Sequence, residues 1–148
     1  MNDVVSPPPQ EATIAAALLE QGRIVHTASL ALALAVVVVA SRHPVGGPGI
    51  VLAVFGVLCL MAESYLAIRV GFDARLFAAL GDGRLDLAAL DAGLTKFGML
   101  TPAKAGRTLA PRFEGAMRLF RFQTICAMLL GTCLLAEMAM MLLAPGLS

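Results

Sequence analysis

The sequence has no tryptophan, a single tyrosine and a formal net charge of only +1 over 148 residues. Because positive charge is barely in excess, the chain lacks the broad basic field that attracts nucleic acid, and we expect no nucleic-acid partner. The shortage of tryptophan and tyrosine also means that the aromatic belt found at the interfaces of many membrane proteins is nearly absent. Any membrane assignment must therefore rest on hydropathy and on basic residues.

Motifs that carry chemistry are missing as well. The three cysteines, Cys59, Cys126 and Cys133, do not have the paired spacing of a zinc or haem site. The one glycine-rich loop with a basic residue, 81–84, lacks both the spacing of a phosphate-binding loop and a preceding strand. Serine, histidine and aspartate are scattered and imply no nucleophilic catalysis. We therefore predict a protein that is not an enzyme, with no catalytic residue, bound metal or cofactor.

Long apolar runs dominate what is present. Hydrophobic residues make up 59% of the chain and its mean hydropathy is +0.84, which is too apolar for a soluble domain of this size. Three runs, 24–40, 49–68 and 122–144, approach or exceed the roughly 20 residues that a helix needs to cross a bilayer. A stretch rich in proline and glycine, 43–49, joins the first two runs as an antiparallel hairpin. The sequence thus predicts an all-α membrane protein with three transmembrane helices.

Basic residues predict how these helices are oriented. Ten of the eleven lysines and arginines lie on one side of a three-span topology, and only Arg42 lies on the other. Cytosolic loops of membrane proteins carry such an excess, so we expect the N-terminus in the cytosol and the C-terminus outside. Arginine outnumbers lysine nine to two, and alanine, leucine and glycine are abundant, a bias typical of GC-rich bacterial genomes. We expect a multi-pass protein of the bacterial inner (cytoplasmic) membrane.

The chain divides into a short tail and one membrane domain. Residues 1–10 contain a proline tract and are predicted to be disordered, whereas 11–148 form a single three-span domain. The first residues lack the basic start of a signal peptide, so we interpret the first run as an uncleaved span. Between the second and third spans, 69–121 is expected in the cytosol, with a short amphipathic helix over 86–97 that Asp86 can cap.

Apolar stripes continue beyond the second and third spans, over 72–80 and 111–121. No helix breaker separates these stripes from their spans, so we favour helices that extend into the cytosol. In the alternative arrangement, the amphipathic pieces lie flat on the inner leaflet. In either case we expect four arginines to contact lipid phosphates or a partner: Arg69, Arg75, Arg118 and Arg121.

Two carboxylates interrupt the apolar runs, Glu63 and Glu137. A charged side chain within the hydrocarbon costs about 2.5–3.5 kcal/mol on insertion scales, so each needs a partner, water or a proton. Counting from the predicted cytosolic boundary, His26 lies at a depth that allows contact with Glu63, whereas Arg42 is the nearest partner in depth for Glu137. These groups either handle protons or cations, or they lock helix packing, and the second interpretation is favoured because a conduction path usually needs more polar residues.

Small residues predict where the helices approach closely, because small side chains four residues apart allow helix backbones into contact. In an alanine- and glycine-rich chain this signal is weak. The predicted packing positions are Gly49, Ala53 and Gly56 in the second span and Ala127 and Gly131 in the third.

Three function classes fit these features. The first is a small non-catalytic accessory or scaffold subunit that packs on the transmembrane helices of other membrane proteins and presents a basic cytosolic segment. The second is a homo-oligomeric pore, either holin-like or a small proton or cation channel that uses Glu63 and Glu137. The third is a lipid-modifying membrane enzyme, for which no nucleophile or base is evident. We expect the first class, because chemistry is absent while interaction surface is plentiful.

Overall fold

The structure, a computed structural model, describes residues 9–42, 47–98 and 106–143. Over these stretches the chain forms helices and no strand. A single residue, Gln21, separates the first two helices, and because its backbone stays helical (φ −58°, ψ −21°) they run on as nearly one rod. The helices in chain order are α1 (Pro9–Glu20), α2 (Gly22–Ala40), α3 (Pro48–Gly81), α4 (Leu87–Lys96) and α5 (Leu109–Leu143).

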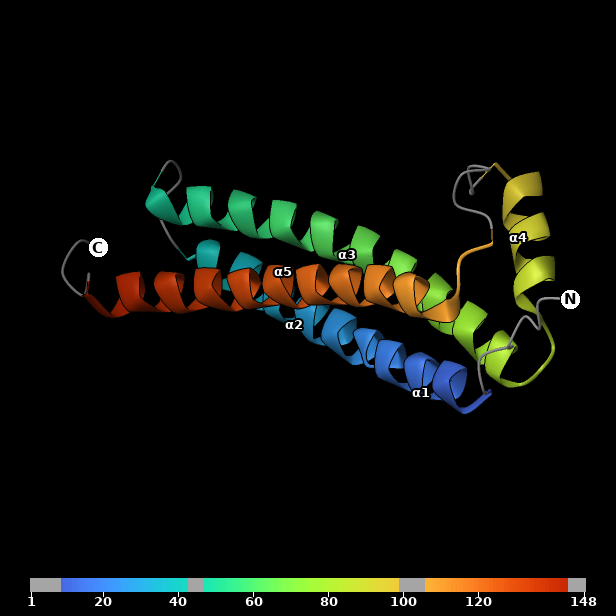
Figure 1. Ribbon diagram of the computed structural model, residues 1–148. Coiled ribbons are helices and arrows are strands. Elements are labelled where there is room, and N and C mark those ends of the chain that lie inside the picture. The colour runs from blue at the N-terminus through green and yellow to red at the C-terminus, as the bar shows by residue number, and fades with distance from the viewer. Residues whose placement is uncertain (1–8, 43–46, 99–105, 144–148) are drawn as a thin grey trace, which may run out of the picture.

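Three of these rods are long and apolar enough to cross a membrane: Gln10–Ala40, Pro48–Gly81 and Leu109–Leu143. They lie side by side, with α3 running against the direction of α2 and α5, while α4 stands across one end (Figure 1). We call that end the basic half: α1, α4, residues 69–81 of α3 and residues 109–121 of α5. The remaining parts of α2, α3 and α5 form the apolar half.

Local signals in the sequence account for the helix ends. Pro48 starts α3 in its first turn, where a missing backbone N–H costs nothing. Gly83, with a φ of +68°, reverses the chain after α3, a conformation that favours glycine. The carboxylate of Asp86 accepts a hydrogen bond of 2.6 Å from the backbone N–H of Ala89 and so caps α4, and Gly98, also at a φ of +68°, follows its end.

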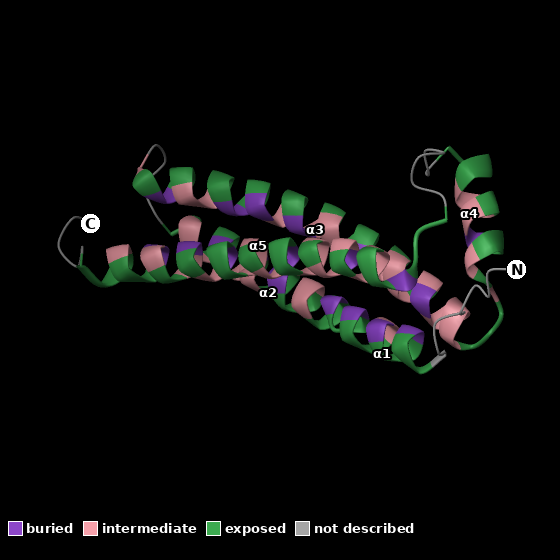
Figure 2. Ribbon diagram, viewed as in Figure 1, coloured by how far each residue is buried: buried purple, intermediate pink, exposed green. Residues whose placement is uncertain are grey.

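Burial recurs at every seventh residue along the long helices, and Figure 2 shows these buried positions on their inward faces. A seven-residue repeat keeps one seam of each helix against its neighbours and is typical of left-handed coiled coils. The repeat runs through Gly22, Ser29 and Val36 in α2, through Gly49, Gly56, Glu63, Val70 and Phe77 in α3, and through Leu109, Ala116, Gln123, Leu130 and Glu137 in α5.

The largest buried cluster lies in the basic half. There α1 packs its small and apolar face, including Ala15 and Leu19, against Val70 and Phe77 of α3. The ring of Phe77 meets Phe113 of α5 edge to face, with centroids 6.2 Å apart. α3 and α5 therefore continue as packed helices beyond their apolar runs, with no break between the two halves.

The predicted packing positions differ in how closely neighbouring helices approach. Gly49 and Gly56 are buried, and a Cβ at Gly56 would lie 3.3 Å from Val36 of α2. Ala53 and Ala127 are half-buried. At Gly131 a Cβ would meet no atom within 4 Å, so this glycine does not mark a close approach between helices.

Candidate functional site

A buried polar cluster ties the three long helices together at the junction of the two halves. The carboxylate of Glu63, in α3, is wholly buried and accepts a hydrogen bond of 2.8 Å from the side-chain amide of Gln123, in α5. Its other oxygen lies 2.8 Å from Nδ1 of His26, in α2. The same Gln123 nitrogen also donates to the backbone carbonyl of Gly22, again at 2.8 Å. The contact between His26 and Glu63 that depth counting suggested is therefore present.

The seven-residue repeat explains why these side chains meet. Glu63 and Gln123 occupy buried positions of α3 and α5, and Gly22 occupies the facing position of α2. Glycine at 22 leaves room for the amide, because a Cβ there would lie 3.0 Å from the Gln123 side-chain oxygen and 3.0 Å from Val70. The sequence therefore places one large polar group from each of two helices against the bare backbone of the third.

The geometry suits a structural lock, meaning a hydrogen-bond network that fixes the helices relative to one another, better than a catalytic centre. One carboxylate accepts from two side chains, and one amide donates to two acceptors, so removing any member leaves a buried polar group short of a partner. The imidazole of His26 is the one group of the cluster that reaches the surface, with 33% of its side chain exposed. A protonated or a neutral ring can donate from Nδ1 to the carboxylate. These hydrogen bonds join the four groups to one another; the Gln123 side-chain oxygen is buried and accepts no hydrogen bond from a described residue, and only the His26 ring reaches the surface.

A second wholly buried carboxylate, Glu137, lies two seven-residue steps beyond Gln123 on the same face of α5. Its predicted partner by depth, Arg42, is exposed at the opposite end of α2 from the buried cluster. Ser29 is also fully buried and donates to the carbonyl of Val25 within its own helix, at 2.9 Å. Glu137 and Ser29 thus turn toward the axis of the bundle, whereas Thr27 and Thr132 are exposed.

The cysteines follow the same inward seam. Cys59 and Cys133 are buried and Cys126 is half-buried, and all three are free thiols. Within the described residues, no group of three or more histidine, cysteine or acidic side chains is arranged to hold a metal ion.

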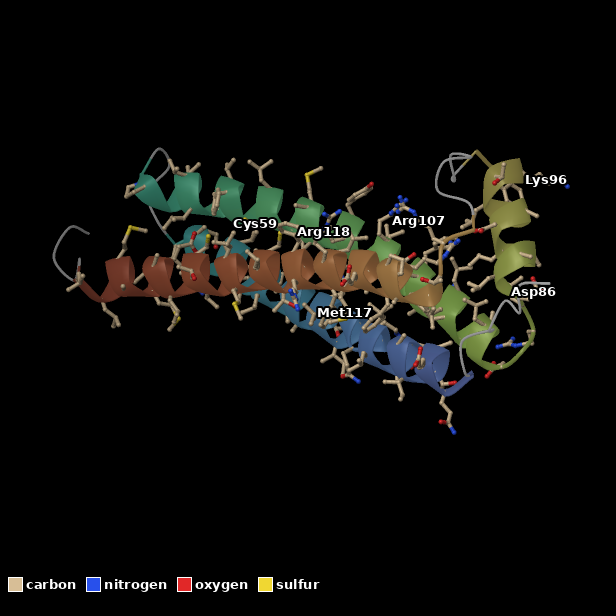
Figure 3. The ribbon with its side chains drawn as sticks, in the orientation of Figure 1. Cys59, Asp86, Lys96, Arg107, Met117 and Arg118 are labelled. Carbon is tan, nitrogen blue, oxygen red and sulfur yellow. The ribbon has the colours of Figure 1, made fainter. Side chains whose placement is uncertain are left out.

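The four arginines singled out from the sequence, Arg69, Arg75, Arg118 and Arg121, are all exposed in the basic half. None of them makes a salt bridge with a described residue. They are split between two helices, however, and do not form one cluster: Arg69 and Arg118 line the same hollow between α3 and α5, whereas Arg75 lines another between α1 and α3. Figure 3 shows the Arg118 side chain between α5 and α3.

A separate ion pair holds α4 to the start of α5. The carboxylate of Asp91 bonds the guanidinium of Arg112 and accepts a 2.7 Å hydrogen bond from the backbone N–H of Gly106. Partial desolvation of Asp91 acts to raise its pKa, but the Gly106 hydrogen bond and the Arg112 bond and charge outweigh it and hold the pKa below its ordinary value of 3.8. Charged Asp91 therefore stabilises the docked position of α4.

We expect acid to release α4. Because the folded pKa of Asp91 is lowered, its contribution is fully present above pH 3.8 and is lost as the pH falls through the lower, folded value. Asp91→Asn should release α4 at neutral pH, and amide hydrogen exchange over 87–96 should rise several-fold with little change in α3. Equal protection in the variant and the native chain at pH 7 would contradict this role, and Asp82→Asn, at an exposed pair outside α4, is the control.

Two members of the buried set, Gln123 and Ser29, were not predicted. Gln123 follows directly after Phe122, so it was absorbed into the third apolar run. The signal that identifies it is its spacing from Glu137, because residues 14 apart share one seam of a coiled coil.

No family model, no curated protein and no solved structure matches this chain.

Proposed function

We propose that this protein is a small non-catalytic accessory or scaffold subunit of a bacterial inner-membrane protein complex. In this proposal the N-terminus and the basic half lie in the cytosol, and α2, α3 and α5 cross the bilayer. The basic half is offered to partners and to the inner leaflet, while the apolar half packs on the transmembrane helices of other subunits.

The observation that carries the proposal is the direction in which the polar groups face. Glu63, Gln123 and Glu137 are each 0% exposed, so these three polar side chains of the apolar runs are enclosed by the chain's own helices. The outward faces of the same helices are lined with exposed apolar side chains such as Leu34, Val51 and Leu135. The bundle therefore presents an apolar outer surface and an exposed basic end that a partner can contact. The buried cluster fixes the positions of its helices relative to one another.

The same observation weighs against a pore. A pore formed between copies of this chain would need polar side chains on an outward face of each copy. Glu63 and Glu137, the two groups that such a pore would use, are enclosed within the bundle of one chain. Lining a pore with them would require the three helices to separate and repack.

Purification at native expression in a mild detergent tests the proposal. We expect a different integral membrane protein to co-purify in fixed stoichiometry and to remain after a wash at high salt. Recovery of the chain alone or as a homo-oligomer would overturn the scaffold proposal. Ion flux into liposomes that Glu63→Gln abolishes would favour the pore. A reporter fused at residue 95 is expected on the cytosolic side, and an external reporter would overturn the proposed orientation.

A further inference from the structure

The hollow between α3, α4 and α5 has apolar walls, and its charged side chains lie at different distances from the apolar half. It has a volume of ≈ 350 Å³, within the range of about 300–1,000 Å³ common for small-molecule sites. Its apolar walls include Phe72, Leu76 and Leu119. Arg69 and Arg118 lie at its end nearest the apolar half, and Asp73 lies one helical turn farther from that half on α3.

The two arginines lie at the same height on neighbouring helices. Glu63 and Gln123 are hydrogen-bonded across the antiparallel pair α3 and α5. Six residues onward along α3 from Glu63, and five residues back along α5 from Gln123, lead to Arg69 and Arg118, a rise of roughly 8–9 Å on each helix. Two guanidinium groups therefore flank one groove just where the apolar runs end.

The charged groups of the hollow differ in whether they already have partners. Arg112 is engaged by Asp91. Arg118 makes no ion pair with a described residue, and half-buried Asp73 makes no hydrogen bond with one, although the charge of Arg69 acts on it. The hollow thus presents two cations at the membrane side and one carboxylate beyond them.

We propose that this hollow binds the headgroup of an inner-leaflet phospholipid with a primary amine, a phosphoethanolamine headgroup. Guanidinium forks suit a phosphate, which Arg69 and Arg118 would hold. The ammonium group, a short distance farther from the bilayer, donates hydrogen bonds to Asp73. The acyl chains run back over exposed apolar side chains one turn along each helix, Tyr65 and Phe122.

This site rests on the proposed orientation, which places Arg69 and Arg118 at the cytosolic surface of the membrane, but it does not depend on the scaffold role. A choline headgroup carries the same charges but has no N–H to donate, and a glycerol headgroup has no cation. A preference for the ethanolamine lipid over the choline and glycerol lipids therefore tests the role of Asp73. Binding of any of these phosphate-bearing lipids tests the role of Arg118.

The full-length chain, purified in mild detergent, is tested by native mass spectrometry with phosphatidylethanolamine, phosphatidylcholine or phosphatidylglycerol of identical acyl chains. We expect retention of the ethanolamine lipid to exceed that of the other two by about fivefold, the effect of one net hydrogen bond to Asp73. Asp73→Asn should remove this preference, and Arg118→Gln should lower retention of the ethanolamine and choline lipids alike, by about fivefold.

Two further variants keep the result interpretable. Gly115 lines the hollow and a Cβ there meets no atom within 4 Å, so Gly115→Leu should fold, fill the space and reduce ethanolamine-lipid retention. Arg75→Gln removes an exposed arginine of the same half that lies outside the hollow, and it should retain the lipid. Equal retention of the three lipids, an unchanged preference in Asp73→Asn, or an equal loss in Arg75→Gln and Arg118→Gln would each overturn the site.

Discussion

Glu63→Ala is expected to lower the free energy of unfolding by about 2–4 kcal/mol. The substitution removes the acceptor for both His26 and Gln123 and leaves a cavity between three helices. Hydrogen bonds between helices in membranes contribute about 1–2 kcal/mol in model systems, and the lost side-chain volume adds to that. The measurement is reversible unfolding in detergent micelles, followed by circular dichroism.

Glu63→Gln is the matched comparison. A glutamine at 63 can still accept from the Gln123 amide, and its own amide can donate to Nδ1 of a neutral His26, so we expect a loss within about 1 kcal/mol of the native chain. If the glutamine variant loses as much as the alanine variant, the charge of the carboxylate matters more than its hydrogen bonds. If neither variant is destabilised, the cluster is not a lock.

The same pair of variants separates structural from proton-handling roles. A lock predicts that Glu63→Gln keeps both stability and association with the proposed partner subunit. A proton-handling site predicts that the variant stays folded but loses its transport activity, because a side-chain amide cannot bind and release a proton as a carboxyl group does. Stability and ion flux measured on one preparation therefore distinguish the two roles.

The fold was largely predictable because hydropathy reports directly on length and apolarity. The three long helices lie where the apolar runs predicted them, and the cap formed by Asp86 follows from its position before a helical stripe. The contact between His26 and Glu63 was also within reach, because a rise of 1.5 Å per residue converts sequence position into depth. Orientation is not visible in the fold and remains a prediction from the basic residues.

The features that the sequence did not predict depend on which face of each helix turns toward the bundle interior. Gln123 was treated as one residue of the third apolar run, without regard to the face of the helix on which it lies. Its pairing with Glu63 was therefore missed. Small-residue spacing proved ambiguous for the same reason, since Gly56 faces a neighbouring helix closely and Gly131 does not. The seven-residue repeat resolves both cases, because it combines position along the helix with position around it.

Gly22→Leu should destabilise the bundle by about 3 kcal/mol, near the upper end of the usual cost of overpacking. A Cβ at 22 would already lie 3.0 Å from the Gln123 side-chain oxygen and 3.0 Å from Val70, and a leucine adds three more carbons in the same space. The amide of Gln123 must then move, which breaks its bonds to the Gly22 carbonyl and to Glu63. The same unfolding assay measures the loss.

Gly131→Leu makes the same chemical change at a half-buried glycine of α5 where a Cβ meets no atom within 4 Å. Leucine favours a helix over glycine by somewhat under 1 kcal/mol, so this variant should be as stable as the native chain or slightly more so. A comparable loss at both positions would mean that the loss at position 22 does not come from its contact with Gln123 and Val70. A loss confined to position 22 ties the stability of the bundle to that contact, because the two variants differ only in what the added side chain meets.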